Sequence, residues 1–267
     1  MRFLKMNGLG NDFVVLDARD EKISLNPELV SRIGHRHMGV GFDQLVVIDH
    51  SKDADFALTF WNSDGSMAGA CGNATRCCAH LLMNELDVET ITLKTERGIL
   101  NAEKRAGDLI AVNMGHAQLE WDQIPLARDV DIDALPIDGA PMAVGMGNPH
   151  CVFFVYDAEN VDVAGMGVVI EHHELYPQRT NVEFVSKLGK DHLRMRVWER
   201  GGMITMACGS GTCASVVAAN RKGLVGESVR VTLDGGDLQI DLKEDGVWMT
   251  GPVSYVFEAT FDPRFLA

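Results

Sequence analysis

The sequence predicts a mixed α/β (α+β) fold made of two pseudo-symmetric halves, each a curved, mostly antiparallel sheet wrapped around a central helix. Three observations predict it: an internal repeat, short strand-like runs throughout, and one apolar helical segment in each half. A chain of 267 residues can bury a separate core in each half. We expect residues 1–115 to form the first half, residues 116–253 the second, and residues 254–267 to return to the first.

The repeat follows one fixed frame. A shift of 137 positions, the separation of Cys71 and Cys208, finds the same residue type again in four separated clusters without a gap. The first-half members are Gly8, Gly10, Asn11, Val15, Trp61, Gly65, Ala70, Cys71, Gly72, Thr75, Thr95 and Gly98. Such a frame indicates a duplicated unit. Duplicated units usually pack about a pseudo-two-fold axis, which would place the two cysteines opposite each other.

Short apolar runs between turn residues predict strands in both halves. They begin at Phe13, Gln44, Phe56, Ile91, Cys151, Asn181, Leu193, Val229, Leu238 and Val247. A helix is predicted directly after each A-C-G segment, and Gly223 ends the second one. Because the second helix is apolar on most faces, we expect it to be buried inside a curved sheet.

The composition limits the classes of partner. A net charge of −14 argues against nucleic acid or an anionic membrane and favours a small-molecule substrate. Lys5, Asn7 and Asp12 interrupt the first segment, so no secretory signal is expected, and no apolar run reaches membrane-spanning length. Six cysteines without a C-x-x-C pair indicate neither a disulfide scaffold nor structural zinc. We therefore expect a cytoplasmic protein.

Cys71 and Cys208 are both expected at a helix start, where outward N–H groups and the helix dipole favour a thiolate and attract an anion. Asn73 and Ser210 are the predicted caps. Two such helix starts converging on one carboxylate would stabilise the charge that forms when its α-carbon loses a proton. With one cysteine on each face, a thiolate removes that proton and a thiol returns another, which is the chemistry of racemisation.

Two alternatives stand beside this interpretation. A lone cysteine is more often a small buried hydrophobe, and this role is assigned to Cys77, Cys78, Cys151 and Cys213. A disulfide or redox switch between the two repeated cysteines is the second alternative.

Polar residues at the same offset indicate a site lined from both halves. They pair as Asn11 with Asn148, Gln44 with Asn181, and Asn62 with Glu199. His150 follows Asn148 by two residues and is a candidate for adjusting the pKa values of the cysteines.

Several segments together resemble the diaminopimelate epimerase family over nearly the whole chain. They read MNGLGNDFVVLD, GVGFDQLVVID, WNSDGSMAGACGNATRC, GNPH, QRTNVEFV and WERGGMITMACGSGTCAS. The resemblance implies interconversion of LL- and meso-diaminopimelate without pyridoxal phosphate, metal or other cofactor, in a pathway that feeds lysine and peptidoglycan synthesis. It also implies two similar α/β halves with the substrate buried between them, often in a homodimer.

Carried over position by position, the resemblance implies that Cys71 and Cys208 are the two catalytic bases and that His150 and Glu199 modulate them. The implied substrate-binding residues are Asn11, Gln44, Asn62, Gly72, Asn73, Asn148, Asn181, Glu199, Arg200, Gly209 and Ser210. Among these, Arg200 is the implied partner of the distal carboxylate, because a guanidinium pairs with a carboxylate bidentately. The related proline racemases carry His where this chain has Asn73, and they are the nearest alternative family.

Overall fold

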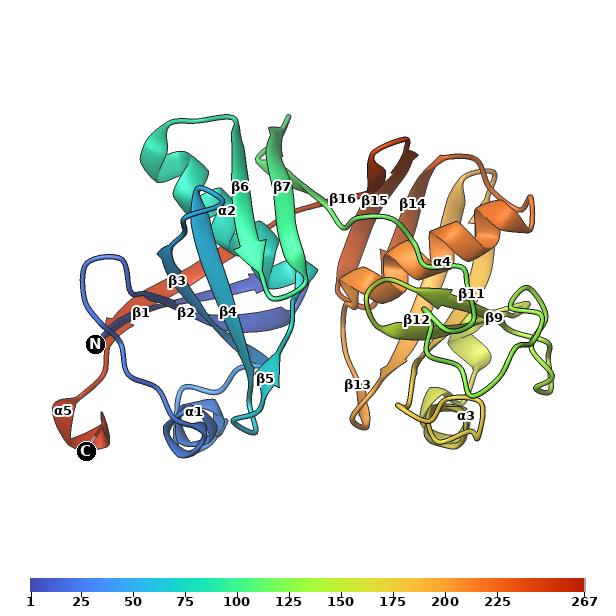
Figure 1. Cartoon of the computed structure of the whole chain (residues 1–267), viewed down its shortest axis with the longest axis horizontal. Coiled ribbons are helices and arrows are strands. Elements are labelled where there is room, and N and C mark those ends of the chain that lie inside the picture. Colours follow the sequence, from blue (N-terminus) through green and yellow to red (C-terminus); the bar gives the residue numbers. More distant parts are fainter. Residues whose placement is uncertain (267) are drawn as a thin grey trace. The chain divides into compact units, whose positions relative to one another are not determined.

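The structure is a computed structural model that describes residues 1–266, and these fold into two compact units (Figure 1). The first unit comprises Met1–Val112 and the chain from Gly251 onward, and the second comprises Asn113–Thr250. Each unit combines many strands with few helices, which confirms the predicted mixed α/β class.

The first unit contains most of its elements before Asn113. They are β1 (Arg2–Gly8), β2 (Asn11–Asp17), α1 (Pro27–Gly34), β3 (Gln44–His50), β4 (Phe56–Asn62), β5 (Met67–Ala68), α2 (Gly72–Leu86), β6 (Thr90–Thr95), β7 (Gly98–Arg105), β8 (Leu109–Asn113), β17 (Ser254–Thr260) and α5 (Pro263–Leu266). Neighbouring strands pair in the order β17, β1, β2, β3, β4, β6, β7, β8, and the short β5 also pairs with β4. The pairs β2–β3 and β4–β6 are parallel and the others are antiparallel.

The second unit repeats this plan. Its elements are β9 (Met142–Gly145), β10 (Pro149–Phe154), the 3₁₀-helix η1 (Ala158–Asn160), α3 (Val163–Glu171), β11 (Asn181–Gly189), β12 (His192–Glu199), β13 (Met203–Ile204), α4 (Gly209–Arg221), β14 (Ser228–Leu233), β15 (Gly236–Lys243) and β16 (Gly246–Gly251). The strand order is β9, β10, β11, β12, β14, β15, β16, with β13 also on β12. Its parallel pairs, β10–β11 and β12–β14, correspond to those of the first unit.

The repeat extends to strand register. Phe13 lies opposite Gln44 in the parallel pair β2–β3, and His150 lies opposite Asn181 in β10–β11. Both residues of the second pair are 137 positions beyond those of the first. The sequence frame therefore identifies residues that occupy equivalent places in the two units.

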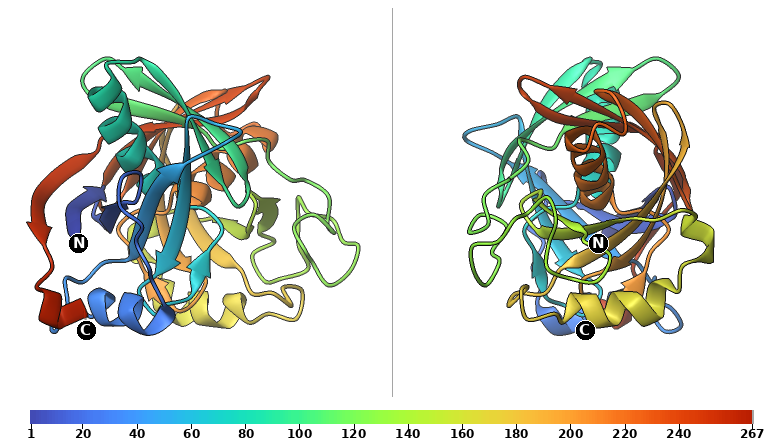
Figure 2. Two further views of the ribbon diagram at one scale, coloured as in Figure 1. Left: turned by 60° about the vertical axis from the view of Figure 1, so that its left-hand side comes forward. Right: turned by 90° about the vertical axis from the view of Figure 1, so that its right-hand side faces the viewer.

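One helix is central to each unit, as predicted. α2 contacts β1, β2, β3, β6 and β7, while α4 contacts β9, β10, β11, β12 and β15. Figure 2 shows α4 enclosed by strands of its own unit. Most side chains of α4 are small and buried, which lets the sheet approach the helix on several sides. Gly223 has a φ of +68°, in the left-handed region that glycine adopts readily, and it follows the end of α4 as predicted.

The short helices α1 and α3 were not predicted. Asn26 caps α1 by accepting a hydrogen bond from the backbone N of Leu29, and Pro27 occupies the first turn. Asp162 caps α3 in the same way through the backbone N of Gly165. The sequence signal for both helices was an Asn or Asp in the N-cap position before a short segment with apolar residues.

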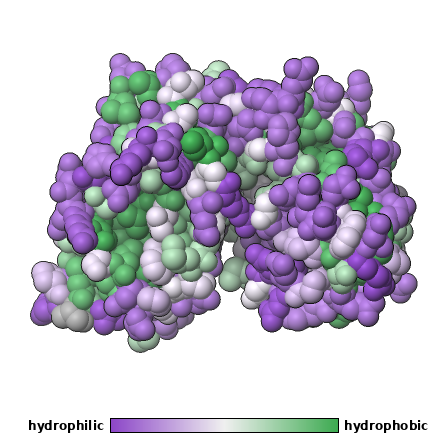
Figure 3. Space-filling view, viewed as in Figure 1, coloured by the Kyte–Doolittle hydropathy of each residue, from purple (hydrophilic) through white to green (hydrophobic). Residues whose placement is uncertain are grey.

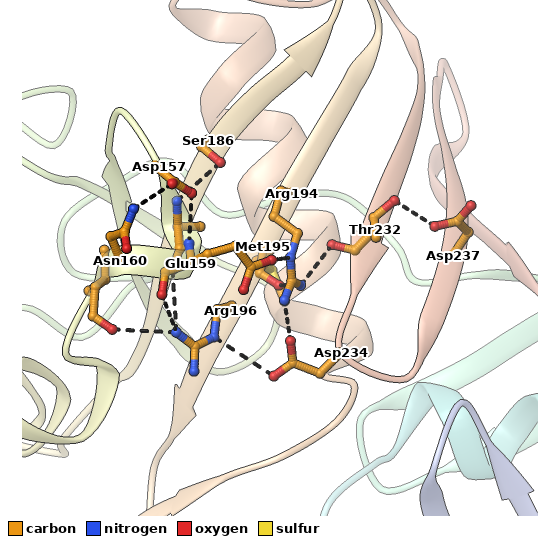
Figure 4. Close-up of polar contacts among 12 residues, drawn as sticks. Asp157, Glu159, Asn160, Ser186, Arg194, Met195, Arg196, Thr232, Asp234 and Asp237 are labelled. Carbon is orange, nitrogen blue, oxygen red and sulfur yellow. Dashed lines mark hydrogen bonds and ion pairs between the residues drawn. The ribbon is translucent and has the colours of Figure 1, made fainter.

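An arginine on β12 ties together three parts of the second unit (Figure 4). Nε of Arg194 donates to Glu159 on η1 at 2.6 Å, and Nη2 donates to Asp234 after β14. Its Nη1 also reaches the carbonyl oxygen of Thr232 at 3.2 Å. This group of residues joins the interior strand β12 to η1 and to the turn after β14.

The face drawn in Figure 3 is mostly hydrophilic, in keeping with the net charge of −14. Three apolar or aromatic side chains on β17 are exposed, namely Tyr255, Val256 and Phe257. None of the helices among residues 1–266 combines the length and hydrophobicity needed to cross a membrane.

Candidate active site

Each repeated cysteine is itself the N-cap of the central helix in its unit. Cys71 precedes α2, and its Sγ accepts a hydrogen bond from the backbone N of Ala74 at 3.5 Å. Cys208 holds the same place before α4. The prediction that Asn73 and Ser210 are the caps was therefore wrong. Both helices begin at the glycine of the A-C-G segment, one residue earlier than expected, and the cysteine before it has an extended backbone.

Asn11 and Asn73 lie together beside Cys71. The Sγ–H of Cys71 points to Oδ1 of Asn11 at 3.9 Å, and Nδ2 of Asn73 donates to the same oxygen at 3.1 Å. Nη1 of the fully buried Arg76 donates to Oδ1 of Asn73 at 2.7 Å, while Nδ2 of Asn11 donates to Asp43 at 2.8 Å. The predicted amides are thus held from behind by two charged residues that the sequence analysis missed.

Gln44 and Asn62 form a second polar pair in the first unit. They are directly opposite in the antiparallel strands β3 and β4, and Nε2 of Gln44 donates to Oδ1 of Asn62 at 3.1 Å. Nδ2 of Asn62 donates to Ser66 at 3.0 Å. Gly72 is the first residue of α2, as Gly209 is of α4.

In the second unit, Asn148 and His150 approach Cys208 through Ser210. The Sγ of Cys208 lies 3.8 Å from Oγ of Ser210, which accepts a hydrogen bond from Nδ2 of Asn148 at 3.4 Å. Oδ1 of Asn148 contacts Nε2 of His150 at 3.1 Å, and the other ring nitrogen lies 2.7 Å from Oε1 of Glu183. Glu183 is fully buried and was not predicted.

The second unit also contains three further predicted site residues, Asn181, Glu199 and Arg200. Nδ2 of Asn181 donates to the carbonyl oxygen of Pro149 at 3.0 Å, and its Oδ1 accepts from the backbone N of Arg200 at 3.0 Å. The exposed side chain of Arg200 donates to the carbonyl oxygen of Gln178 at 3.3 Å. Glu199 accepts a hydrogen bond from Thr205.

Electrostatics at Cys208 differ from the expectation for a helix start. Burial raises the pKa of the Cys208 thiol well above its usual value, and the carboxyl groups of Glu199 and Glu183 raise it further. The backbone N–H of Gly211 and the hydroxyl of Ser210 act in the opposite direction but do not compensate. The expected lowering of the pKa is therefore wrong for Cys208 in this structure, because burial and two carboxyl groups outweigh the helix terminus.

The other four cysteines lie in the protein core, as predicted. Cys77, Cys78, Cys151 and Cys213 are all fully buried. Burial raises the pKa of Cys77 to about 12 and that of Cys78 well above its usual value. Thiols in this state are unreactive, so these residues act as small hydrophobes. Residues 1–266 contain no group of three or more His, Cys, Asp or Glu side chains placed to hold a metal ion.

The carboxylate of Asp12, next to Asn11 in the sequence, helps to hold this part of the site in place. Asp12 accepts hydrogen bonds from Arg36 at 2.8 Å and from Lys5. Burial raises the pKa of Asp12, but the hydrogen bonds from Arg36 and Lys5 oppose it, and the net pKa lies below the usual value. The carboxyl group of Asp43 accepts hydrogen bonds from both neighbours, from the backbone N of Asp12 and from Nδ2 of Asn11.

We expect Asp12→Asn to lower the free energy of unfolding at pH 7 by about 1–3 kcal/mol, because it breaks a partly buried ion pair. Since the folded-state pKa is depressed, this stabilisation is complete above the unfolded pKa of about 3.9 and is lost as pH falls through the folded value. Urea unfolding of both proteins across this pH range measures the difference. A difference that stays constant down to the lowest pH would contradict the assignment.

Comparison with known proteins identifies the family. The family model described as diaminopimelate epimerase matches residues 3–120 and 142–256. The diaminopimelate epimerase of Rhodospirillum centenum is 51% identical, with 99% of this chain and 94% of that protein covered. The diaminopimelate epimerase of Acidiphilium cryptum is 45% identical, with 99% and 98% covered.

Two solved structures of low sequence identity share the fold. A hydroxyproline epimerase from Agrobacterium vitis, with bound trans-4-hydroxy-L-proline, has a TM-score of 0.70 at 13% identity and covers 100% of this chain and 94% of its own. A PhzF-family phenazine biosynthesis protein from Bacillus anthracis also has a TM-score of 0.70, at 14% identity, covering 97% and 98%. These likenesses concern architecture alone, whereas the family model and the close relatives span nearly all of the sequence. The chain belongs to the diaminopimelate epimerase family.

Proposed function

We propose that this protein interconverts LL-2,6-diaminopimelate and meso-diaminopimelate without a cofactor, using Cys71 and Cys208 as the two proton carriers. The observation that carries the proposal is the pair of cysteines, each the N-cap of a central helix, in a chain of this family. Its products would feed lysine and peptidoglycan precursor synthesis.

In the proposed reaction, the thiolate of one cysteine takes the α-proton of the substrate as H⁺. The electron pair stays on the α-carbon and spreads into the adjacent carboxylate, which the backbone N–H groups of the two helix starts stabilise. The thiol of the other cysteine then delivers its proton to the opposite face and becomes the thiolate. The stereocentre is inverted, and the protein returns to its starting charge with the roles of the cysteines exchanged.

The proposed binding residues form two groups, those in the first turns of α2 and α4 and those outside these helices. Gly72, Asn73, Gly209 and Ser210 belong to the first turns of α2 and α4, where N–H groups can receive the reacting carboxylate. The remaining proposed substrate-binding residues are Asn11, Gln44, Asn62, Asn148, Asn181, Glu199 and Arg200. Arg200 would pair with the distal carboxylate, and His150 with Glu199 would adjust the cysteine pKa values.

Incubation with meso-diaminopimelate in deuterium oxide tests the function directly. We expect deuterium at the α-carbon and formation of the LL isomer with no added cofactor, as measured by NMR and chiral chromatography. A protein that exchanges no α-proton under these conditions is not a diaminopimelate epimerase.

Oxidation separates the epimerase from the redox-switch alternative. If both sulfurs address one carbon, we expect removal of substrate and reductant to allow a Cys71–Cys208 disulfide, loss of activity, and recovery with dithiothreitol. Bound diaminopimelate should protect, because the substrate carbon would lie between the sulfurs. Non-reducing peptide mapping with and without substrate measures this. Disulfide formation at the same rate in both samples, with no turnover by the reduced protein, would support the redox switch instead.

We also propose a cytoplasmic homodimer. The exposed residues Tyr255 and Phe257, which lie on the same face of strand β17, support a contact with a second copy, since neighbouring exposed apolar side chains mark interaction surfaces. Light scattering coupled to size-exclusion chromatography measures the mass. A monomer at micromolar concentration would contradict this part of the proposal.

A further inference from the structure

A buried ionisable pair lies behind Cys208. His150 on β10 and Glu183 on β11 are both fully buried, with 2.7 Å between Nδ1 of the imidazole and Oε1 of the carboxyl group. Because the amide oxygen of Asn148 faces the other ring nitrogen at 3.1 Å and can only accept, that nitrogen carries a hydrogen. The other ring nitrogen and Oε1 of Glu183 lie at hydrogen-bonding distance.

The pair is the inner end of a chain of contacts that reaches the cysteine. From Glu183 it continues through His150 to Asn148, then to Ser210, and ends at the sulfur of Cys208. His150 and Asn148 each use a different group for each neighbour, so Glu183 fixes the ring of His150, and the ring fixes the amide of Asn148. The hydroxyl of Ser210 makes both of its contacts. Removing Glu183 would release the whole chain.

Glu183 also approaches the sulfur by a direct route, and a glycine makes room for it. A Cβ at Gly211 would lie 2.6 Å from Oε1 of Glu183 and 3.2 Å from Sγ of Cys208. Both atoms are therefore within 3.2 Å of one point in the first turn of α4. An alanine there would collide with the carboxyl oxygen.

The first unit has apolar residues at the places equivalent to His150, Glu183 and Gly211. Shifted by 137 positions, His150 corresponds to Phe13, Glu183 to Val46 and Gly211 to Ala74. Phe13, Val46 and Ala74 are fully buried too. The strand registers agree, since Val15 lies opposite Val46 and Val152 lies opposite Glu183. The first unit thus packs three apolar residues where the second holds an ionisable pair and the space for it.

Stability does not explain the pair. Oε2 of Glu183 is buried and has no hydrogen-bond partner among residues 1–266. A buried acceptor left in this state costs about 1–3 kcal/mol, and apolar residues of similar size are often at least as stabilising as a buried polar pair. The first unit shows that the fold accepts the apolar solution at these positions.

We propose that Glu183 is a positioning residue for Cys208, which holds His150 and Asn148 in place beside the sulfur and favours the thiol form of this cysteine in the resting protein. The inference rests on the proposed function, and it makes the two proton carriers unequal before substrate binds. Glu183 and Glu199 act on the Cys208 thiol through their charge, while Ser210 and the N–H of Gly211 act as hydrogen-bond partners. The first unit has Val46 and Asn62 at the places equivalent to the two carboxyl groups.

Glu183→Gln tests the proposal because it keeps the shape and an acceptor for His150 but removes the acid. Alkylation by iodoacetamide as a function of pH, followed at each cysteine by peptide mapping, reports the thiolate form without requiring turnover. We expect the pH midpoint for Cys208 to fall by about one unit while that for Cys71 stays unchanged. We also expect kcat to fall about tenfold to a hundredfold with little change in KM.

Glu159→Gln is the matched control. It makes the same carboxyl-to-amide change in the second unit, at the exposed partner of Arg194, and should leave both midpoints and kcat unchanged. An unmoved Cys208 midpoint in Glu183→Gln would overturn the proposal. So would a shift of equal size in Glu159→Gln. Wild-type turnover is measured separately, and its absence would refute the proposed function rather than this inference.

A triple variant tests the same proposal if Glu183→Gln folds poorly. The combination His150→Phe, Glu183→Val and Gly211→Ala installs the apolar set of the first unit. We expect this triple variant to fold, whereas Gly211→Ala alone should be destabilised because its Cβ meets Glu183. The triple variant should show the lowered Cys208 midpoint and a large loss of kcat. Wild-type kcat and midpoint in a folded triple variant would overturn the proposal.

Discussion

Replacing either Cys71 or Cys208 by alanine is expected to reduce epimerisation by at least about a thousandfold, since each substitution removes an acid–base group that the proposed reaction cannot replace. Inversion needs a proton carrier on both faces of the carbon. With Cys71 absent, one face has no group to exchange a proton, and with Cys208 absent the other face has none. The two single variants should therefore be about equally inactive.

Folding should survive both substitutions. Cys71 is only partly buried, and its replacement removes one cap hydrogen bond, from the backbone N of Ala74, which costs about 0.5–2 kcal/mol. Circular dichroism and thermal unfolding check this, and NMR in deuterium oxide measures turnover. Cys77→Ala and Cys213→Ala are the controls, because both thiols lie in the core and should affect packing rather than chemistry. Near wild-type turnover in either Cys71→Ala or Cys208→Ala would refute the two-base assignment.

The architecture could be predicted because its signals are repeated and local. The predicted strands and the two central helices are all present, and the end of α4 at Arg221 follows from the glycine two residues later. The offset of 137 positions found in the sequence also holds for strand register. Phe13 lies opposite Gln44 in the first unit, and His150 lies opposite Asn181 in the second. The helices α1 and α3 escaped prediction because eight or nine residues carry too little periodicity against a background of strands.

The electrostatics of the site could not be predicted in the same way. A helix start favours a thiolate, and the sequence gives no measure of the burial that opposes it at Cys208. Glu183 is a charged residue within an apolar strand run, and this was the sequence signal for a special role. Its partner could not be identified, because His150 is on another strand and 33 positions away. Arg76 was hidden similarly, inside a helix whose pattern indicated core. Such pairings depend on tertiary packing, which periodicity does not encode.

Arg200→Ala is expected to raise KM strongly, by roughly 30-fold to several thousandfold, which corresponds to the 2–5 kcal/mol typical of a truncated charge pair. The substitution keeps the backbone N–H that donates to Oδ1 of Asn181, so the neighbouring amide should stay in place. The lost group is the guanidinium, whose Nη1 donates to the backbone carbonyl oxygen of Gln178 at 3.3 Å. It therefore retains donors for a carboxylate.

The change should appear mainly in KM because the distal carboxylate does not alter its charge during the reaction, so its binding is the same in the ground and transition states. Arg200→Lys should recover little, since an ammonium cannot reproduce the bidentate pairing of a guanidinium. Arg128→Ala is the matched control, at an exposed arginine that pairs with Glu174 in the same unit. Steady-state kinetics with all three variants measures the effect. An unchanged KM in Arg200→Ala would mean that another residue binds the distal carboxylate, and a fall in kcat alone would place Arg200 at the reacting end instead.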